Sequence, residues 1–316
     1  MKTLIIGAGA VGIGVGASLI QGGMEVEFFA RGNTKNSIDK YGIKRTGVFG
    51  DYSVPAGTIK TYDSYSDLPV YEYDFVLVAT KNYANEEVAA GFNEYRDCMT
   101  DECKIVFLQN GLGYQVPFLQ YFEESQLYHC RLITGFEKEA DNISCVTAHQ
   151  APILFGSLFG YDCEEARPLM EALVNAGVSS ELKQDIEKDM WAKFIYNTTL
   201  NPIGAILNMT YGELADSEYA HSIMDILIEE TFEIMNAVDG KTYWDNADDY
   251  REVLYNQVIP DTYNHRSSTL QDITRKQKTE IDLLTGSLLE LSAECNVPAP
   301  VHSMIYWLVK ALEEKF

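Results

Sequence analysis

The chain has 316 residues, of which 46% are hydrophobic and 22% are charged, so it can bury a core large enough for more than one compact unit. This composition excludes a disordered or collagen-like chain. Lysine and arginine total 24 against 47 aspartates and glutamates, which gives a formal net charge of −23. Such a surface repels phosphate backbones and anionic lipid headgroups, and the apolar runs are shorter than a bilayer requires, so we expect neither a nucleic-acid nor a membrane partner.

The six cysteines form neither CxxC pairs nor a zinc-ligand pattern with histidine. We interpret them as buried or incidental thiols and expect no metal site. The first residues, MKTLIIGAGAVGIG, are apolar like a signal peptide, but their regularly spaced glycines favour a strand that runs into a turn. We therefore expect a reduced, cytoplasmic protein, either a monomer or a homodimer.

Short apolar runs alternate with amphipathic stretches from residue 2 to about residue 183. The runs TLIIG, EVEFFA, DFVLVAT and KIVFLQN are typical of buried strands, and the stretches between them are typical of helices. The alternation predicts an α/β fold: an N-terminal Rossmann-like dinucleotide-binding domain over residues 1–184, with a mainly parallel sheet. Segment 129–158 has β character without helices, so we expect it to add antiparallel strands to one end of this sheet.

Long helical patterns replace the strands after about residue 184. They cover residues 185–207, 216–238, 245–257, 267–296 and 301–315. The sequence thus predicts an all-helical C-terminal domain over residues 185–316, which carries the substrate and the catalytic groups. No linker rich in Gly and Ser separates the two domains, so we expect them to pack closely around a cleft. The acidic segment 213–252 is interpreted as a solvated face.

A GxGxxG motif follows the first predicted strand and opens a helical stretch. Its first glycine permits a tight turn, its second lets the backbone approach a pyrophosphate, and its third lets helix and strand pack closely. The phosphates then lie at the positive end of the helix. A structural turn without a nucleotide is the alternative. The motif predicts a cofactor-binding loop made of Gly7, Ala8, Gly9, Ala10, Val11 and Gly12.

Arg31 stands at the end of the second predicted strand, where NAD enzymes usually place an acid on the ribose 2′-hydroxyl. Its guanidinium can pair with a 2′-phosphate instead, so the sequence favours NADP (NADPH), although an exposed turn arginine is the alternative. Glu27 lies mid-strand, too early to be the ribose acid. Lys81 and Asn110 follow later strands, where polar residues face the cofactor, and together with the glycine loop they indicate a nicotinamide site, although either alone could be an ordinary loop residue.

Lys193, Asn197 and Asn201 are spaced four residues apart in WAKFIYNTTLNP and share one face of a helix. A lysine and two asparagines within an apolar surround suit a substrate with a carbonyl and hydroxyl or carboxylate groups. The alternative is a solvent-facing stripe, but such stripes favour Glu, Lys and Gln over repeated Asn.

Ser268 and Glu280 belong to a second polar cluster, which runs from residue 265 to residue 286. In an unbroken helix they would be separated by ~18 Å at a rise of 1.5 Å per residue, so they could not bind the same atom. Either Ser268 precedes the helix in a turn, or the two residues hold different ends of a bound pair of ligands. An exposed charged helix face is the bland alternative.

Five motifs, taken in order along nearly the whole chain, resemble the ketopantoate reductase family (2-dehydropantoate 2-reductase). They are GAGAVG with Arg31, VATK ending at Lys81, LQNG with Asn110, WAKFIYNTTLNP, and SSTLQDITRKQKTEIDLLTG. The resemblance implies NADPH-dependent reduction of the 2-oxo acid ketopantoate to pantoate, on the route to pantothenate and coenzyme A.

The resemblance also implies residue roles. Lys193 corresponds to the proton donor to the nascent alkoxide, and Asn197, Asn201 and Ser268 to substrate-binding positions. Asn110 corresponds to a contact with both cofactor and substrate. Glu280 and Lys81 correspond to residues that reach the cofactor, Lys81 at its nicotinamide end. An ammonium beside a developing oxyanion can both stabilise and protonate it, which agrees with the role of Lys193.

Three positions depart from the family pattern: Tyr211 and His265 stand where asparagine is frequent, and Ala84 stands where glutamine is frequent. These changes fall around the substrate, so they favour keeping a second hypothesis, a paralogous reductase of another 2-oxo acid or carbonyl. A third hypothesis, a non-catalytic NADP-binding regulator, would have no need for the polar residues of the helical domain.

Overall fold

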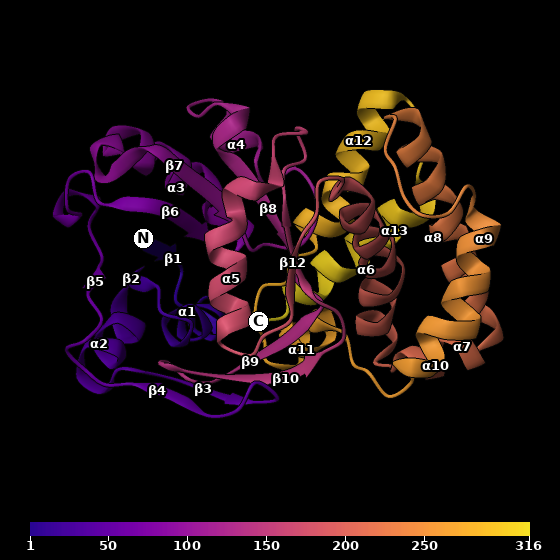
Figure 1. The fold of residues 1–316 in the computed structure, drawn as a ribbon. Coiled ribbons are helices and arrows are strands. Elements are labelled where there is room, and N and C mark those ends of the chain that lie inside the picture. Colours follow the sequence, from indigo (N-terminus) through magenta and orange to yellow (C-terminus); the bar gives the residue numbers. More distant parts are fainter. The chain divides into compact units, whose positions relative to one another are not determined.

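The computed structural model describes all residues from Met1 to Phe316 and shows two compact units (Figure 1). The first unit comprises Met1–Gln109 and Tyr114–Ile186, and the second comprises Asn110–Gly113 and Glu187–Phe316. Residues Asn110–Gly113 are thus grouped with the second unit, although the residues on both sides of them in the sequence belong to the first. No helix combines the length and the apolar character that crossing a bilayer requires.

An eight-stranded sheet forms the centre of the first unit. Its strands are β1 (Lys2–Ile6), β2 (Glu25–Phe29), β5 (Thr61–Tyr62), β6 (Tyr73–Val78), β7 (Met99–Phe107), β8 (Leu127–Arg131), β11 (Ile153–Gly156) and β12 (Ser180–Leu182). The order is β12-β11-β8-β7-β6-β1-β2-β5. The strands from β8 to β5 run parallel to their neighbours, whereas β11 is antiparallel to β8. The predicted α/β class with a mainly parallel sheet is confirmed.

A second, four-stranded sheet has the order β4-β3-β10-β9. Its strands are β3 (Ile43–Gly47), β4 (Tyr52–Val54), β9 (Thr134–Ala140) and β10 (Ile143–His149). The prediction that 129–158 adds antiparallel strands to the main sheet is wrong for β9 and β10 and right only for β11. The physical reason is their one-sided character: β9 has no buried residue and β10 has two, which suits a sheet covered on one face.

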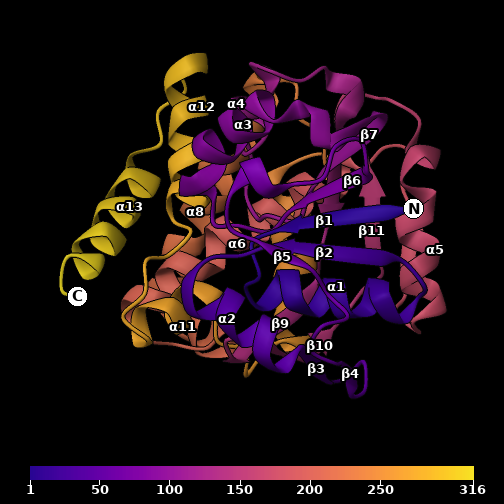
Figure 2. The ribbon, with the colours of Figure 1, turned by 90° about the vertical axis from the view of Figure 1, so that its left-hand side faces the viewer.

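Five helices belong to the first unit: α1 (Ala10–Gln21), α2 (Gly32–Tyr41), α3 (Asn85–Glu94), α4 (Val116–Leu119) and α5 (Arg167–Asn175). Helix α1 lies between the two sheets, in contact with β1 and β2 on one side and with β3, β9 and β10 on the other (Figure 2). A Cβ at Gly14 would lie 2.6 Å from the ring of Phe136, so the glycine permits this close packing.

The second unit is helical, as predicted. Its helices are α6 (Glu187–Leu207), α7 (Tyr211–Asp216), α8 (Glu218–Ala237), α9 (Ala247–Val253), α10 (Ile259–Asp261), α11 (Ser268–Thr274), α12 (Ser287–Cys295) and α13 (Pro300–Glu313). Helix α6 packs against α8, α11 and α13. Phe194, Ile203, Met224 and Ile228 belong to the buried core that α6 and α8 share.

The prediction of one long helical stretch over residues 267–296 is wrong. Helix α11 ends at Thr274, Lys276 adopts a left-handed backbone with φ 56°, and Gln277 N donates to Asp272 O at 2.9 Å. A π-helical turn, Asp282–Gly286, then leads into α12. The left-handed residue closes the helix, and the non-helical stretch that follows contains Glu280.

Candidate active site

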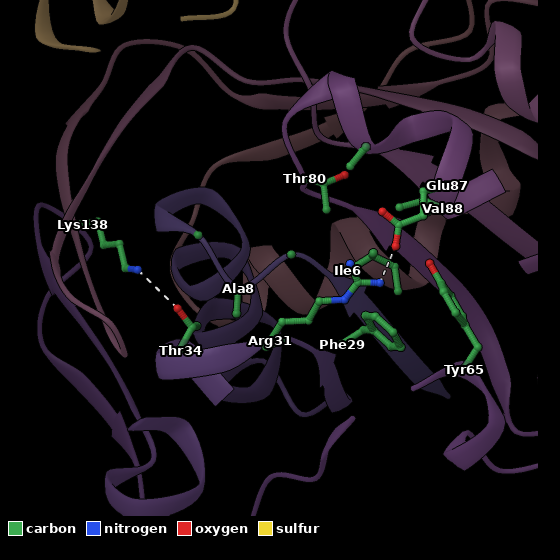
Figure 3. A pocket seen from close by; sticks show the side chains of 14 residues that line it. Ile6, Ala8, Phe29, Arg31, Thr34, Tyr65, Thr80, Glu87, Val88 and Lys138 are labelled. Atoms are coloured by element: carbon green, nitrogen blue, oxygen red, sulfur yellow. Dashed lines mark hydrogen bonds and ion pairs between the residues drawn. The ribbon is translucent and has the colours of Figure 1, made fainter. Parts of the chain in front are cut away.

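A cavity of about 280 Å³ lies in the first unit at the carboxyl ends of β1 and β2 (Figure 3). Ile6 at the end of β1, Phe29 at the end of β2 and Thr80 beyond β6 line it. Since β2 and β6 flank β1 on opposite sides, the strand order reverses here. Ligands of open α/β sheets bind in such a crevice outside the carboxyl ends of the strands.

The backbone of the GxGxxG loop shapes this cavity. Gly7 has φ +96°, and a Cβ there would lie 2.8 Å from the Thr80 backbone nitrogen. A Cβ at Gly12 would lie 2.0 Å from the Gly7 carbonyl oxygen, so only glycine lets α1 meet β1 this closely. Gly9 differs, because a Cβ there would have no other atom within 4 Å, and this residue lines the cavity.

The same loop leaves hydrogen-bond donors for a ligand. Gly9 is the N-cap of α1 and has no side chain to accept from the first-turn N–H groups of this helix. Open space beside Gly9 and uncapped N–H groups at a helix start fit the pyrophosphate of a dinucleotide. Of the six predicted loop residues, Gly7, Ala8 and Gly9 line the cavity.

Arg31 also lines the cavity. Its side chain is 57% exposed, and its Nη2 lies 2.5 Å from Oε1 of Glu87 on α3. The Glu87 carboxylate raises the pKa of Arg31 above its ordinary value, so the guanidinium stays charged. Sequence reasoning missed Glu87, whose only signal is its place in the acidic first turn of α3.

Two further predicted residues of this unit differ in their relation to the cavity. Lys81 follows Thr80 and precedes the 3-10 turn Asn82–Ala84, but it is not among the residues that line the cavity. Ala84 does line it, so the expectation that this departure from the family pattern falls around the substrate is wrong. Glu27 is buried mid-strand and accepts hydrogen bonds from Tyr73 at 2.6 Å and Tyr62 at 3.1 Å. Its carboxylate is thus engaged within the sheet and does not line the cavity.

In the second unit, three residues distant in sequence form one hydrogen-bonded chain. Lys193 Nζ on α6 donates to Asn110 Oδ1 at 2.6 Å, and Asn110 Nδ2 donates to Glu280 Oε2 at 3.1 Å. A lysine can only donate and an ionised carboxylate can only accept, so the orientation of the Asn110 amide is fixed by its partners. The structure therefore brings together a predicted proton donor and two predicted cofactor contacts.

Gly111 allows this arrangement. Its φ is +96°, and a Cβ there would lie 2.3 Å from the carbonyl oxygen of Leu283 in the π-helical turn. The segment Asn110–Gly113 thus packs directly on the turn that follows Glu280. The predicted LQNG motif therefore supplies both the amide of Asn110 and the glycine that lets it approach.

Asn197 and Asn201 form a separate chain with Tyr211 on the same unit. The Tyr211 hydroxyl donates to Asn201 Oδ1 at 2.7 Å, and Asn201 Nδ2 donates to Asn197 Oδ1 at 3.3 Å. Tyr211 is 2% exposed, and this burial raises its pKa well above the ordinary value, so it acts as a neutral donor. Asn201 is itself buried, whereas Asn197 is half-buried.

The predicted Ser268 lies in the first turn of α11 and is exposed. Its neighbour Ser267 is the buried serine: Ser267 Oγ donates to the Asn201 backbone oxygen at 3.1 Å and accepts from Leu270 N at 3.1 Å. Ser267 thus caps α11 and ties it to α6. Sequence reasoning missed this role, although a serine directly before a helical stretch is the usual N-cap signal.

Comparison with known proteins identifies the family of the chain. The family described as "Ketopantoate reductase PanE/ApbA" matches residues 3–159, and its counterpart "Ketopantoate reductase PanE/ApbA C terminal" matches residues 185–313. The 2-dehydropantoate 2-reductase of Aquifex aeolicus is 30% identical over 314 residues, which cover 99% of this chain and 97% of that protein.

Solved structures share the fold over the full length. A PanE/ApbA family ketopantoate reductase from Ralstonia eutropha has a TM-score of 0.83 at 24% identity and covers 100% of this chain and 99% of its own. A D-mandelate dehydrogenase solved with NADH and anilino(oxo)acetate has a TM-score of 0.84 at 21% identity, with the same shares covered. With family matches over both units and a relative 30% identical along its whole length, the chain belongs to the ketopantoate reductase family of oxidoreductases.

Proposed function

We propose that the protein reduces ketopantoate to pantoate with NADPH, on the route to pantothenate and coenzyme A. The observation that carries the chemical part of this proposal is the Lys193–Asn110–Glu280 chain, in which an ammonium is held 2.6 Å from an amide oxygen. A reductase of a 2-oxo acid needs a positioned acid at the oxygen of the carbonyl that receives hydride.

The bound coenzyme supplies the hydride, and the chain's own residues supply the proton. As the carbonyl carbon is reduced, negative charge develops on its oxygen. The Lys193 ammonium stabilises this charge and donates a proton to it, which leaves a neutral amine that takes a proton from solvent. Asn110 directs the Lys193 side chain, and Glu280 fixes the Asn110 amide.

Most of the residues proposed to bind the coenzyme belong to the first unit, whereas Asn110 and Glu280 belong to the second. The loop Gly7–Gly12, of which Gly7, Ala8 and Gly9 line the cavity, would hold the pyrophosphate, and Arg31 would hold the 2′-phosphate. Lys81 is assigned to the nicotinamide end, and Asn110 and Glu280 to further coenzyme contacts. Preference for NADPH rests on Arg31, which can pair with a phosphate and cannot accept from a ribose hydroxyl.

The substrate site is proposed on the second unit, at Asn110, Asn197, Asn201 and Ser268. Their amide and hydroxyl groups can donate to the carboxylate and hydroxyl oxygens of a 2-oxo acid. Because Asn201 is occupied by Tyr211 and Asn197, the N–H groups of the half-buried Asn197 are the donors of that chain best placed to meet a substrate.

A second candidate function is the reduction of a different 2-oxo acid. The buried Tyr211 hydroxyl takes up the Asn201 oxygen, which a hydroxylated substrate would otherwise use. In addition, a D-mandelate dehydrogenase has the same fold. This candidate keeps the role of Lys193 and changes only the group that the substrate carries beyond its carbonyl.

Steady-state kinetics with NADPH and a panel of 2-oxo acids that includes ketopantoate and phenylglyoxylate separates the candidates. We expect the highest kcat/KM for ketopantoate; a far higher value for another acid would favour the second candidate.

Lys193→Ala should lower kcat by about 10²- to 10⁴-fold. Lys188→Ala, in the first turn of the same helix, is the matched control and should keep near wild-type turnover. Full activity of Lys193→Ala would contradict the proposed acid.

A further inference from the structure

The coenzyme cavity contains a lysine that the proposed reaction does not use. Lys138, on β9 of the four-stranded sheet, lines the cavity although it is distant in sequence from the GxGxxG loop (Figure 3). Its Nζ lies 3.3 Å from the hydroxyl oxygen of Thr34, which lines the same cavity from the first turn of α2. The second sheet therefore contributes a cation to a cavity that the main sheet builds.

The charges around the cavity leave an anion poorly compensated without this lysine. Arg31 and Lys138 are the two cationic residues that line it, and Glu87 is the acidic one. Arg31 is paired with Glu87 at 2.5 Å and Lys138 with Asp141 at 2.7 Å, so part of each positive charge is already matched and neither cation alone compensates a phosphate. A phosphate monoester carries about −1.5 to −2 charges at neutral pH and therefore needs a further cation.

Arg31 and Lys138 reach the cavity from different sides. In Figure 3, Lys138 and Thr34 point toward each other on one side of Ala8, whereas the Arg31 guanidinium extends away from them toward Glu87. In enzymes of this fold class, a phosphate on the adenosine ribose lies beyond the end of β2, where Arg31 here leads directly into the first turn of α2. Thr34 and Lys138 are the polar side chains on the α2 side of that position.

We propose that Lys138, together with Thr34 and Arg31, binds the phosphate on the adenosine ribose of the coenzyme and determines the preference for NADPH over NADH. This inference rests on the proposed function, because it assigns a residue to the coenzyme site proposed there. Lys138 acts as a charged donor and Thr34 as a neutral one. Asp141, whose Oδ1 lies 2.7 Å from Lys138 Nζ, competes with the phosphate for the lysine.

The test compares the dissociation constants of NADPH and NADH between the wild type and Lys138→Gln. Both constants are measured from the fluorescence of the bound coenzyme, without substrate. Lys138→Gln should raise the Kd for NADPH about five- to tenfold, which corresponds to the loss of one partly exposed charge-assisted hydrogen bond, and leave that for NADH within about twofold. The effect on NADPH should shrink as salt is added. Asp141→Asn should lower the Kd for NADPH.

Lys35→Gln is the matched control. Lys35 follows Thr34 on α2 and pairs with Asp39 at 2.8 Å, but it does not line the cavity. It should leave both dissociation constants unchanged. Lys138 is exposed on the strand surface, and its side chain is 38% accessible, so thermal melting of Lys138→Gln should match that of the wild type.

Competition with adenosine 2′-phosphate and adenosine 5′-phosphate locates the effect. The 2′-phosphate should displace NADPH less well in Lys138→Gln, and the 5′-phosphate should be unaffected. If Lys138→Gln changed the Kd values for NADPH and NADH equally, or changed neither, the inference would be overturned. If Arg31→Ala still raised the Kd for NADPH strongly and specifically in the same experiment, the proposed function would remain intact. Wild-type protein that binds NADH as tightly as NADPH would contradict both.

Discussion

Tyr211 determines which hydrogen-bonding groups remain for a ligand on the helix face that carries Lys193, Asn197 and Asn201. Its hydroxyl donates to Asn201 at 2.7 Å, so the second of the two stripe asparagines is satisfied within the protein and positions Asn197. The ring also contacts Tyr196 and His265, with centroids 5.5 and 5.0 Å apart. Tyr211 and His265, two of the positions that depart from the family pattern, are thus in contact with each other.

Tyr211→Phe should separate the structural and binding roles of this hydroxyl. It leaves a buried carbonyl acceptor without its donor, which costs about 1–3 kcal/mol of unfolding free energy. We expect a lower melting temperature and a changed KM for the 2-oxo acid, with kcat less affected because Lys193 keeps its own partner. Urea unfolding and steady-state kinetics measure both. Tyr219→Phe, at a tyrosine that is 79% exposed, is the control, and equal effects of the two variants would contradict this role.

At the scale of elements, a short loop and a π-helical turn position Asn110, the hydrogen-bond partner of the proposed acid Lys193. The loop Asn110–Gly113 follows β7 yet packs with the helical unit, and the π-helical turn Asp282–Gly286 follows the non-helical stretch that holds Glu280. A Cβ at position 111 would lie only 2.3 Å from the Leu283 carbonyl oxygen. The position of Asn110 therefore depends on a backbone contact that no other residue type permits.

Gly111→Ala should disturb this contact and misplace Asn110. A displacement of about 1 Å can cost roughly 10²-fold in rate, so we expect a large loss of kcat. Gly113→Ala is a matched control, because Gly113 also has a positive φ of +75° but would bring its Cβ near no other atom. The control should lose only about 1 kcal/mol of stability from its left-handed backbone and keep most of its turnover. Comparable kcat losses in both variants would count against the close approach.

Each unit of the molecule buries one carboxylate that accepts several hydrogen bonds. Glu27 accepts from Tyr73, Tyr62 and Lys2, and Glu230 accepts from the backbone of Val301 and from His302. Burial alone would raise the pKa of both groups, but these hydrogen bonds leave each pKa below its ordinary value. Both carboxylates therefore stabilise the folded state in their ionised form.

These two groups predict how stability depends on pH. Because the folded-state pKa is lowered, the unfolded chain binds more protons in acid, so the stabilisation is complete above the unfolded value of about 4.3 and is lost as the pH falls through the folded value. Glu27→Gln should lower the unfolding free energy by about 1–3 kcal/mol at pH 7. The difference in unfolding free energy between Glu27→Gln and the wild type should become smaller toward pH 3.

Urea unfolding at several pH values between 3 and 7 measures this dependence. Glu233→Gln, at an exposed position on the same helix as Glu230, should change stability little at any pH. A constant difference between Glu27→Gln and the wild type over this range would show that ionisation of Glu27 does not contribute.

The net charge of −23 also belongs to the whole molecule, and it says little about the cavity. Arg31 and Lys138 are cations placed locally against a surface that is acidic on average. A sum over the chain cannot reveal such a placement, because the field within a cavity depends on the nearest charges and on their shielding from solvent.

The sequence by itself determined the features that depend on neighbours along the chain. Apolar strands alternating with helices predicted the parallel sheet, and GxGxxG in its strand and helix context predicted the loop that lines the cavity. The four-residue spacing of Lys193, Asn197 and Asn201 follows from the helical period alone. Five ordered motifs were enough to indicate the family.

Only the tertiary structure decided the contacts between distant segments. The partners of Asn110, the pairing of Arg31 with Glu87 and the approach of Lys138 to Thr34 join residues 83, 170, 56 and 104 positions apart. The second sheet was not predicted because β3 carries Arg45 at a buried position and β9 has no buried residue, so neither shows the apolar alternation of a strand. Glu280 met Asn110 because a left-handed residue ends α11, and a helical pattern in a sequence does not show where such a break falls.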